Sequence, residues 1–342
     1  MMQIVSLSDA ITLQRGFDLP TSRRRQGKYP VVASTGTTTT HDKFKVKGPG
    51  VVIGRSGSIG GGQYVESDFW PLNTTLWVKD FKGNDEKFIY YTLKSLDFSS
   101  FNVGAAVPTL NRNHLSALKV RIPDVDKQKK IANILGSLDE KIELNRRMNE
   151  TLEQLGQTLF RHYFIDNPDA KNWKKRSLGE FFPVKTGKKD ANFGTKDGKF
   201  PFFTCAQTIS RAPSYSFDGS AILVAGNGDF NIKYYTGKFE AYQRTYVLIP
   251  HNEELLGFLY FLMKKDLSLI TGGSRGSVIK FITKGMIENY RVELPDDNDL
   301  AAFAPIFSEL LALISHINEQ IQTLAALRDI LLPKLISGEI EA

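Results

Sequence analysis

The sequence predicts an α+β protein in which two similar α/β domains alternate with two long antiparallel helices, related by a pseudo-two-fold repeat. The stretch GKYPVVAS at 27–34 returns as GKFPFFTC at 198–205, and Ile-Pro-Asp at 122–124 returns as Leu-Pro-Asp at 294–296. The offsets are 171 and 172 residues, and a long apolar heptad pattern follows each Pro-Asp pair. Self-similarity at a fixed offset indicates a repeated structural unit, here a domain followed by a helix.

The first domain is expected over residues 1–124 and the second over 167–297. Strands are predicted where apolar and β-branched residues gather between glycine-rich turns. They fall at 29–34, 51–53 and 75–78 in the first domain and at 221–225 and 244–249 in the second. A short helix follows them at 87–94 and again at 256–265, with Phe88 aligned to Phe258 and Tyr90 to Tyr260. Each domain is therefore predicted to mix strands with a covering helix.

The two long helices are expected within 125–166 and 298–342. Apolar residues recur there at alternating steps of four and three, which predicts a coiled-coil seam. The residues predicted to pair the helices are Ile131, Leu135, Leu138, Ile142, Leu152 and Leu159 in the first, and Phe303, Phe307, Leu310, Ile314, Ile317, Ile321, Leu324 and Leu331 in the second. Asn145 and Asn149 also fall on the seam, where they could fix its register or lie in solvent.

The direction of the helices follows from the length of their connections. A helix of about 37 residues is roughly 55 Å long, whereas a domain of about 130 residues is only about 30 Å across. The second domain joins the end of one helix to the start of the other through short segments, so these two ends must lie together. The helices are therefore predicted to be antiparallel. The outward residues Ile134, Met148, Leu155, Leu311 and Leu313 are expected to be partly uncovered, which predicts poor solubility without partners.

The positive charge lies on the domains. Residues 1–125 carry 16 Lys and Arg against 10 Asp and Glu, and residues 167–297 carry 19 against 14. Residues 126–166 are balanced at 7 and 7, and residues 298–342 carry 2 against 6. This distribution predicts that the domains face a polyanion and that the helices face protein.

Composition and motifs argue against catalysis by this chain. The single cysteine, Cys205, excludes a disulfide framework and a cysteine-rich zinc site, and the five histidines are too dispersed for a metal motif. No phosphate loop, dinucleotide-binding spacing or amino-methyltransferase tetrapeptide is found. With no apolar run near 18 residues and no cleavable leader recognised, a soluble cytoplasmic protein is expected. We therefore predict no catalytic residues, no metal site and no cofactor in this chain.

The loops of both domains carry side chains suited to nucleic acid. Arg, Asn and Gln can contact base edges, whereas Lys and Ser suit phosphates. The candidates are Arg23, Arg24, Arg25, Arg55, Ser56, Ser58, Gln63 and Tyr64 in the first domain, and Lys188, Lys189, Asn227, Asn231, Lys233, Tyr234, Tyr235, Ser274 and Arg275 in the second. An exposed loop side chain with no ligand is the competing interpretation for each of them.

Several motifs resemble those of one family. The segment VPTLN at 107–111, the run QKKIANIL at 128–135 and the run LDEKI at 138–142 resemble the end of a target recognition domain and the central helix of type I restriction-modification specificity subunits. Asn172-Trp173-Lys174 resembles the opening of the second recognition domain, and LPKLISGEI at 332–340 resembles the carboxyl end. The chain departs from the pattern at Leu300, where the first helix has Gln128, and at Met2, where the second domain has Trp173.

The resemblance implies a non-catalytic DNA reader. Each recognition domain would read one half of a bipartite DNA site, and the helices would dock two modification (methyltransferase) subunits, with restriction (endonuclease) subunits joining the complex. S-adenosylmethionine, ATP and magnesium would belong to those partners. The alternatives are a specificity subunit of a methylation-only or other defence system, a DNA-modifying enzyme that acts alone, and a coiled-coil scaffold whose basic domains are incidental.

Overall fold

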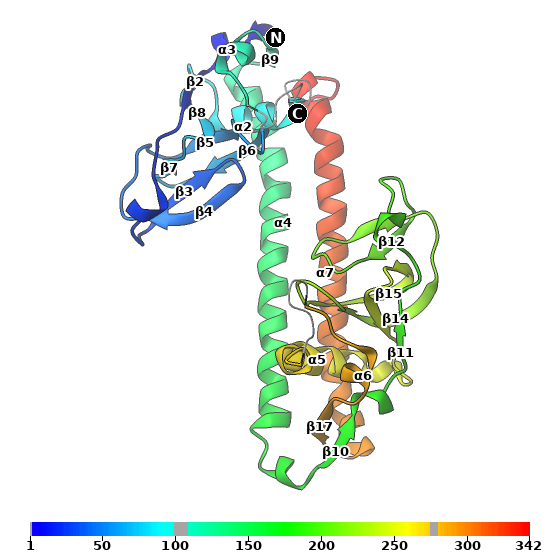
Figure 1. Cartoon of the computed structure of the whole chain (residues 1–342). Coiled ribbons are helices and arrows are strands. Elements are labelled where there is room, and N and C mark those ends of the chain that lie inside the picture. The colour runs from blue at the N-terminus through cyan, green and yellow to red at the C-terminus, as the bar shows by residue number, and fades with distance from the viewer. Residues whose placement is uncertain (1, 99–108, 274–279) are drawn as a thin grey trace. The chain divides into compact units, whose positions relative to one another are not determined.

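The computed structural model describes residues 2–98, 109–273 and 280–342 (Figure 1). The chain divides into two compact units, Met1–Asn145 with Gln320–Ala342, and Arg146–Glu319. Each unit contains one α/β domain and a part of each long helix, α4 (Val125–Phe160) and α7 (Asp297–Ser337).

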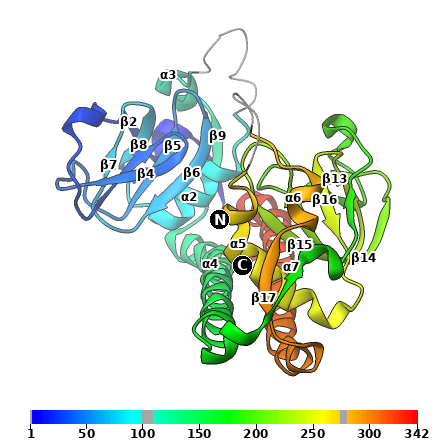
Figure 2. The same ribbon diagram turned by 60° about the horizontal axis from the view of Figure 1, so that its bottom comes forward.

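The first unit has a four-stranded antiparallel sheet as its centre. Its strand order is β2 (Thr12–Arg15), β8 (Thr75–Asp80), β5 (Gly50–Gly54) and β6 (Gly60–Val65). Two smaller sheets are formed by β4 (Gly36–His41), β3 (Tyr29–Ala33) and β7 (Trp70–Pro71), and by β1 (Gln3–Ser6) with β9 (Lys119–Ile122). The short helical segments are α1 (Leu7–Ala10), η1 (Thr21–Arg23) and α3 (Arg112–Ser116). Helix α2 (Glu86–Ser95) covers β5 and β6 (Figure 2).

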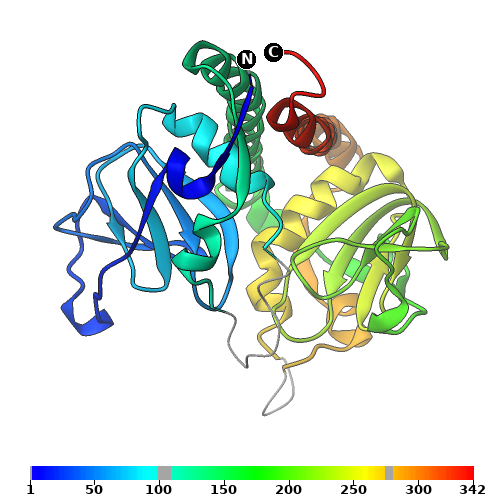
Figure 3. The ribbon, with the colours of Figure 1, turned by 90° about the horizontal axis from the view of Figure 1, so that it is seen from above.

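The second unit has a six-stranded sheet. Its order is β11 (Val184–Thr186), β16 (Thr245–Leu248), β14 (Phe217–Ala225), β15 (Ile232–Ala241), β12 (Phe200–Phe203) and β13 (Ser210–Ala212). Strands β10 (Lys174–Ser177) and β17 (Arg291–Leu294) form a separate pair. The helical segments are η3 (Arg161–Ile165), η4 (Pro168–Asn172), η5 (Leu178–Glu180), η6 (Ala191–Phe193), η7 (Glu253–Leu255) and α6 (Lys284–Glu288). Helix α5 (Leu256–Ile270) lies along β14 and β15 (Figure 3).

The central strands are apolar at consecutive positions because both of their faces are buried. In β5, Ile53 packs in the core that α2 covers, whereas Val52 packs on the opposite side with Val32 and Phe69. The same alternation recurs in β14, where Val224 faces the core with α5 and Leu223 faces the other side. The predicted α+β class and the duplicated domains are confirmed.

Both long helices begin at a Pro-Asp pair for the same local reason. The Asp124 carboxylate accepts a hydrogen bond from the Lys127 backbone N–H at 3.0 Å, which lowers the pKa of this carboxyl. Asp296 accepts from the backbone N–H groups of Asn298 and Asp299, each at 3.1 Å. An aspartate before the first turn satisfies backbone donors that have no partner within the helix.

The helices pair antiparallel within each unit. In the first unit the Arg328 guanidinium binds the Asp139 carboxylate at 2.7 Å. In the second unit the rings of Phe160 and Phe307 lie 5.9 Å apart. The residue number rises along α4 as it falls along α7 in each unit, from Asp139–Arg328 to Asn145–Gln320 in the first and from Asn149–Asn318 to Phe160–Phe307 in the second. The predicted direction is confirmed.

The two asparagines on the seam are bonded to the opposite helix. Asn145 is 1% exposed, and its side-chain amide donates to Gln320 Oε1 at 3.2 Å. The Asn149 amide donates to Asn318 Oδ1 at 2.8 Å. Asn145 is thus buried, which favours a role in fixing the register over solvation.

The apolar stripes of the helices contact the domains as well as each other. All fourteen predicted pairing residues are buried or half-buried, but Ile131 and Leu135 share a core with α2, and Phe307 shares one with α5. Leu311 is only 3% exposed, so the expectation that it faces outward is wrong, because the second domain covers it. The other outward residues remain exposed, namely Ile134, Met148, Leu155 and Leu313.

Helix α7 is apolar enough along part of its length to meet the composition of a membrane span. Among the described helices it alone has such a stretch, with a mean hydropathy of 1.8, of which 33% is buried. The sequence has no unbroken apolar run near 18 residues, because polar residues such as Ser308, Glu309 and Ser315 interrupt it, but they do not lower the average hydropathy of the window much. Phe307 and Ile314, within this helix, pack in the core of the second unit.

Glycine at position 257 permits the close approach of α5 to α7. A Cβ built there would lie 2.4 Å from the backbone carbonyl carbon of Phe307. We expect Gly257→Ala to lower the free energy of unfolding by about 1–3 kcal/mol, since backbone cannot move aside as a side chain can. Gly285→Ala, whose Cβ would meet only the Asn289 side chain at 3.5 Å, is the control and should stay within about 0.5 kcal/mol. Urea denaturation measures both, and equal stabilities would contradict this packing.

Candidate nucleic-acid interface

The glycine-rich loops after β5 and β14 are held by the same backbone hydrogen bonds. Leu110 N–H donates to Arg55 C=O at 2.7 Å, and Ile282 N–H donates to Gly226 C=O at 3.0 Å. Isolated bridges accompany them, Ser56 with Thr109 and Asn227 with Phe281. The partners are again 171 or 172 residues apart. The sequence repeat is therefore a repeat of loop architecture.

The first loop is tightly folded. Gly57 has φ +81°, a left-handed conformation that favours glycine, and a Cβ on Gly54 would lie 1.9 Å from the Ser58 carbonyl oxygen. Around this turn Arg55 and Ser56 are half-buried and Ser58 is exposed. The loop thus presents its polar side chains from a fixed backbone.

Arg55 lines a cavity that sequence reasoning did not anticipate. The cavity is about 380 Å³ in volume, and its lining residues are Arg15, Arg55, Leu76, Thr109, Leu110, Asn111 and Arg112. Arg15 and Arg112 are exposed. They were missed because β2 and α3 are distant in the chain, and the only signal was a lone arginine in each segment.

The remaining candidates of the first domain have internal contacts. Gln63 donates its side-chain amide to Ala33 C=O at 3.1 Å, and burial raises the pKa of Tyr64, whose ring lies 6.1 Å from that of Tyr90. Arg24 donates to Leu19 C=O at 3.3 Å, whereas the side chains of Arg23 and Arg25 are exposed.

In the second loop, Asn231 and Lys233 shape the backbone. Asn231 is 8% exposed, and its amide donates to the carbonyls of Cys205 and Asp229, each at 2.9 Å. The Lys233 ammonium donates to Ala206 C=O at 2.7 Å, and burial lowers the pKa of this lysine. Both side chains are used internally. Asn227 lies at the loop itself, half-buried, with no side-chain hydrogen bond to the described residues.

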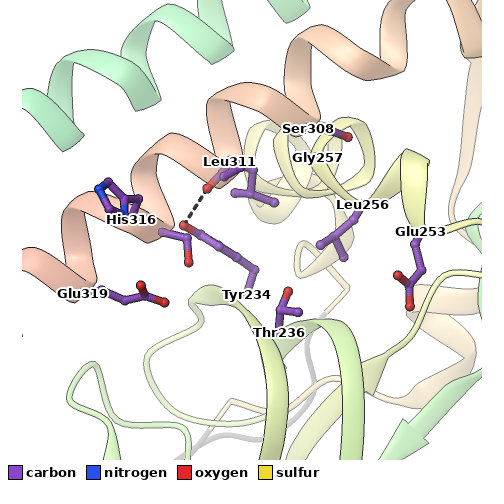
Figure 4. A pocket seen from close by; sticks show the side chains of 11 residues that line it. Tyr234, Thr236, Glu253, Leu256, Gly257, Ser308, Leu311, His316 and Glu319 are labelled. Atoms are coloured by element: carbon purple, nitrogen blue, oxygen red, sulfur yellow. Dashed lines mark hydrogen bonds between the residues drawn. The ribbon is translucent and has the colours of Figure 1, made fainter.

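The two tyrosines on β15 point to opposite faces. Tyr234 donates its hydroxyl to Leu311 C=O on α7 at 3.1 Å, beside a cavity of about 340 Å³ that α5 and α7 also line (Figure 4). Burial raises the pKa of Tyr234. Tyr235 packs on Phe203, with ring centroids 5.4 Å apart. Tyr234 is therefore directed at the helix rather than at the loops.

The remaining candidates for DNA contact in the second domain are Lys188 with Lys189 and Ser274 with Arg275. The ammonium of Lys188 lies 5.9 Å from the ring centroid of Phe217, and that of Lys189 lies 4.6 Å from that of Phe193. Ser274 and Arg275 lie outside the described residues. Within the described ranges, no group of three His, Cys, Asp or Glu side chains is placed to hold a metal ion.

The comparison with known families separates the same two halves. The family described as "Type I restriction modification DNA specificity domain" matches residues 1–154 and again 170–324. Each match contains one α/β domain and the adjoining part of one long helix. The chain belongs to this family. Its internal duplication is thus a pair of specificity domains.

Three similar proteins carry specificity-subunit names. The chain is 44% identical over 173 residues to the type I restriction enzyme EcoDI specificity subunit of Escherichia coli, covering 49% of this chain but only 39% of that protein. It is 24% identical over 318 residues to the MjaIX specificity subunit of Methanocaldococcus jannaschii, covering 79% of this chain and 73% of that one. The S subunit crystal structure from M. genitalium matches with a TM-score of 0.67 at 20% identity, over 98% of this chain and 96% of that chain. At this identity the last match supports the fold alone.

The two specificity domains attach to their helices by different chemistry. Gln128 is 1% exposed, accepts from Asp85 N–H at 2.8 Å and donates to Pro123 C=O at 2.9 Å. Leu300 stands at the corresponding place in α7, 1% exposed in an apolar core. A hydrogen-bonded glutamine in one specificity domain is thus replaced by apolar packing in the other.

The contrast between Asn231 and Asn227 can be tested by stability. Asn231→Ala should lower the free energy of unfolding by about 1–3 kcal/mol, because the nearly buried Asn231 amide that bonds the carbonyls of Cys205 and Asp229 is removed. Asn227→Ala is the matched control and should stay within about 0.5 kcal/mol. Chemical denaturation of both variants is the measurement. A neutral Asn231→Ala would show that the side chain does not support the loop.

Proposed function

We propose that this chain is the non-catalytic DNA-reading specificity subunit of a type I restriction-modification complex. Each domain reads one half of a bipartite site on double-stranded DNA. The observation that carries the proposal is the duplicated loop scaffold on two positively charged domains, found in a chain of the specificity-domain family.

The loop chemistry supports base reading at fixed positions. Ser56 and Asn227 occupy equivalent bridges in the two domains, and the backbone around each is held by strand-end hydrogen bonds. An asparagine can form a bidentate contact with adenine in the major groove. Different side chains on one scaffold would give the two domains different half-sites.

The surface of the helices supports docking of protein partners. Apolar side chains stay exposed in each unit, for example Leu144 at 53% and Ile330 at 58% in the first, and Leu155 at 44% and Leu313 at 45% in the second. The charge on these helices is low or negative. We propose that two methyltransferase subunits cover them and that restriction subunits complete a cytoplasmic complex for phage defence. S-adenosylmethionine, ATP and magnesium would be bound by the partners.

Exchange of one domain tests the proposal that each domain reads its own half-site independently of the other. The chain is co-expressed with its methyltransferase subunits, and methylated adenines are mapped in genomic DNA. Replacing residues 171–296 with the second domain of a relative should change one half-site and leave the other intact. Simultaneous change of both half-sites in an assembled hybrid contradicts the proposal. Methylation by the purified chain alone would indicate an enzyme instead.

A matched shortening of the helices tests whether they set the spacing. Removing seven residues from α4 and seven from the facing part of α7 preserves the heptad register and shortens each helix by about 10 Å. The mapped half-sites should then move closer by about three base pairs, at roughly 3.4 Å per pair. Removal from α4 alone is the control and should destabilise the seam. Original spacing with a folded, matched deletion would assign the distance to the partner subunits.

A further inference from the structure

Three arginines from distant segments converge at one end of the four-stranded sheet. In the strand register Arg15 lies opposite Leu76, and Leu76 lies opposite Ile53. Since side chains two residues apart share a face, Arg55 follows Ile53 on the face that Arg15 and Leu76 occupy. The hydrogen bond from Leu110 N–H to Arg55 C=O brings in the start of α3, with Arg112. The result is the cavity of about 380 Å³ already described.

None of these three guanidinium groups has a carboxylate within 4 Å or a hydrogen bond to any residue that the structure describes. Other arginines of the chain do have partners, such as Arg176 with Glu180 and Arg328 with Asp139. Residues 99–108, which precede the cavity-lining segment in the chain, contain no Asp or Glu. Three like charges around one cavity repel each other, and an anion would relieve that repulsion.

The second domain fills the equivalent place with a side chain. The shared hydrogen bonds align Arg55 with Gly226 and Leu76 with Tyr246. The Tyr246 ring lies 2.9 Å from where a Cβ on Gly226 would be, and its hydroxyl donates to Ile282 C=O at 2.8 Å. At the positions of Arg15 and Arg112 the second domain has Thr186 and Lys284, and Lys284 is paired with Glu288 at 3.1 Å. Among the residues that the structure describes, the arginine cavity is therefore found in the first domain and has no equivalent in the second.

We infer that Arg15, Arg55 and Arg112 form a phosphate-binding site that holds the backbone of DNA against the first domain. The inference rests on the proposed function. The planar guanidinium matches phosphate oxygens in a bidentate geometry, and three of them on one cavity suit a single phosphodiester better than a base edge. Such a contact positions the duplex and reads no sequence. The two domains thus differ in how they contact DNA, and the first domain contributes a salt-dependent phosphate contact that the described part of the second domain does not repeat.

The test compares salt dependence of DNA binding between variants of the full chain, alone or with the co-expressed methyltransferase subunits. Fluorescence anisotropy is measured with a duplex that carries the mapped site and with an unrelated duplex. R15Q/R112Q should make the slope of log K against log salt shallower by about 0.9, the value for one phosphate, on both duplexes. R15K/R112K, which keeps the charge, should restore most of the slope. Lys284→Gln, at the equivalent position of the second domain, should leave it unchanged.

Each outcome separates this inference from the proposed function. If wild type binds neither duplex, the proposed function fails. If wild type binds but R15Q/R112Q keeps the wild-type slope, or if Lys284→Gln shifts the slope equally, only the arginine site is overturned. A loss confined to the mapped site would make the arginines base readers. Inorganic phosphate is also added to the wild type and to R15Q/R112Q. If it weakens DNA binding by the wild type more than its ionic strength accounts for, if R15Q/R112Q abolishes this effect, and if the DNA salt slope stays unchanged, the cavity binds free phosphate instead.

Discussion

The seam between α4 and α7 is the constraint on which both units depend. Each domain core closes on residues from both helices, so neither domain has a complete core without them. In the first unit Leu135 of α4 and Leu335 of α7 pack in the core with α2, and in the second unit Phe160 and Phe307 pack with α5. Helices of this length are marginal alone, and burial of their apolar stripes supplies most of their stability.

In each unit a tyrosine of the α/β domain is hydrogen-bonded to a carboxylate on α4, but the residues involved differ. In the first, Tyr91 donates to the Asp139 carboxylate at 2.8 Å, and Arg328 of α7 binds the same carboxylate. In the second, Tyr260 donates to Glu153 at 3.1 Å, and Lys264 binds that carboxylate. Burial, together with the neighbouring carboxylate, raises the pKa of both tyrosines. Tyr91 does not align with Tyr260 in the repeat. Both units therefore have a hydrogen bond from a tyrosine to a carboxylate on α4, but the residues that form it stand at different positions of the repeat.

Divergence between the domains is concentrated in side chains around a shared backbone. The backbone hydrogen bonds from Leu110 and Ile282 to the strand ends are equivalent. The side chains differ, because Arg55 lines a charged cavity in the first domain, whereas the Tyr246 ring packs against Gly226 at the equivalent place in the second. Backbone hydrogen bonds tolerate such exchanges because they do not depend on side-chain identity. A scaffold of this kind can present different surfaces without refolding.

Periodicity and repetition in the sequence were sufficient to predict the domain class, the duplication and the antiparallel helices, because these depend on apolar patterning and connection lengths. The same patterning could not reveal that Leu311 is covered by the second domain, or whether Asn145 is buried, since both depend on what packs against the helix. Loop composition identified both Arg55 and Asn231 as candidates for DNA contact. The structure shows, however, that the Asn231 amide is hydrogen-bonded to backbone carbonyls of its own domain. The meeting of Arg15, Arg55 and Arg112 was decided only by the tertiary structure, because strand register and one backbone hydrogen bond bring together residues nearly a hundred positions apart.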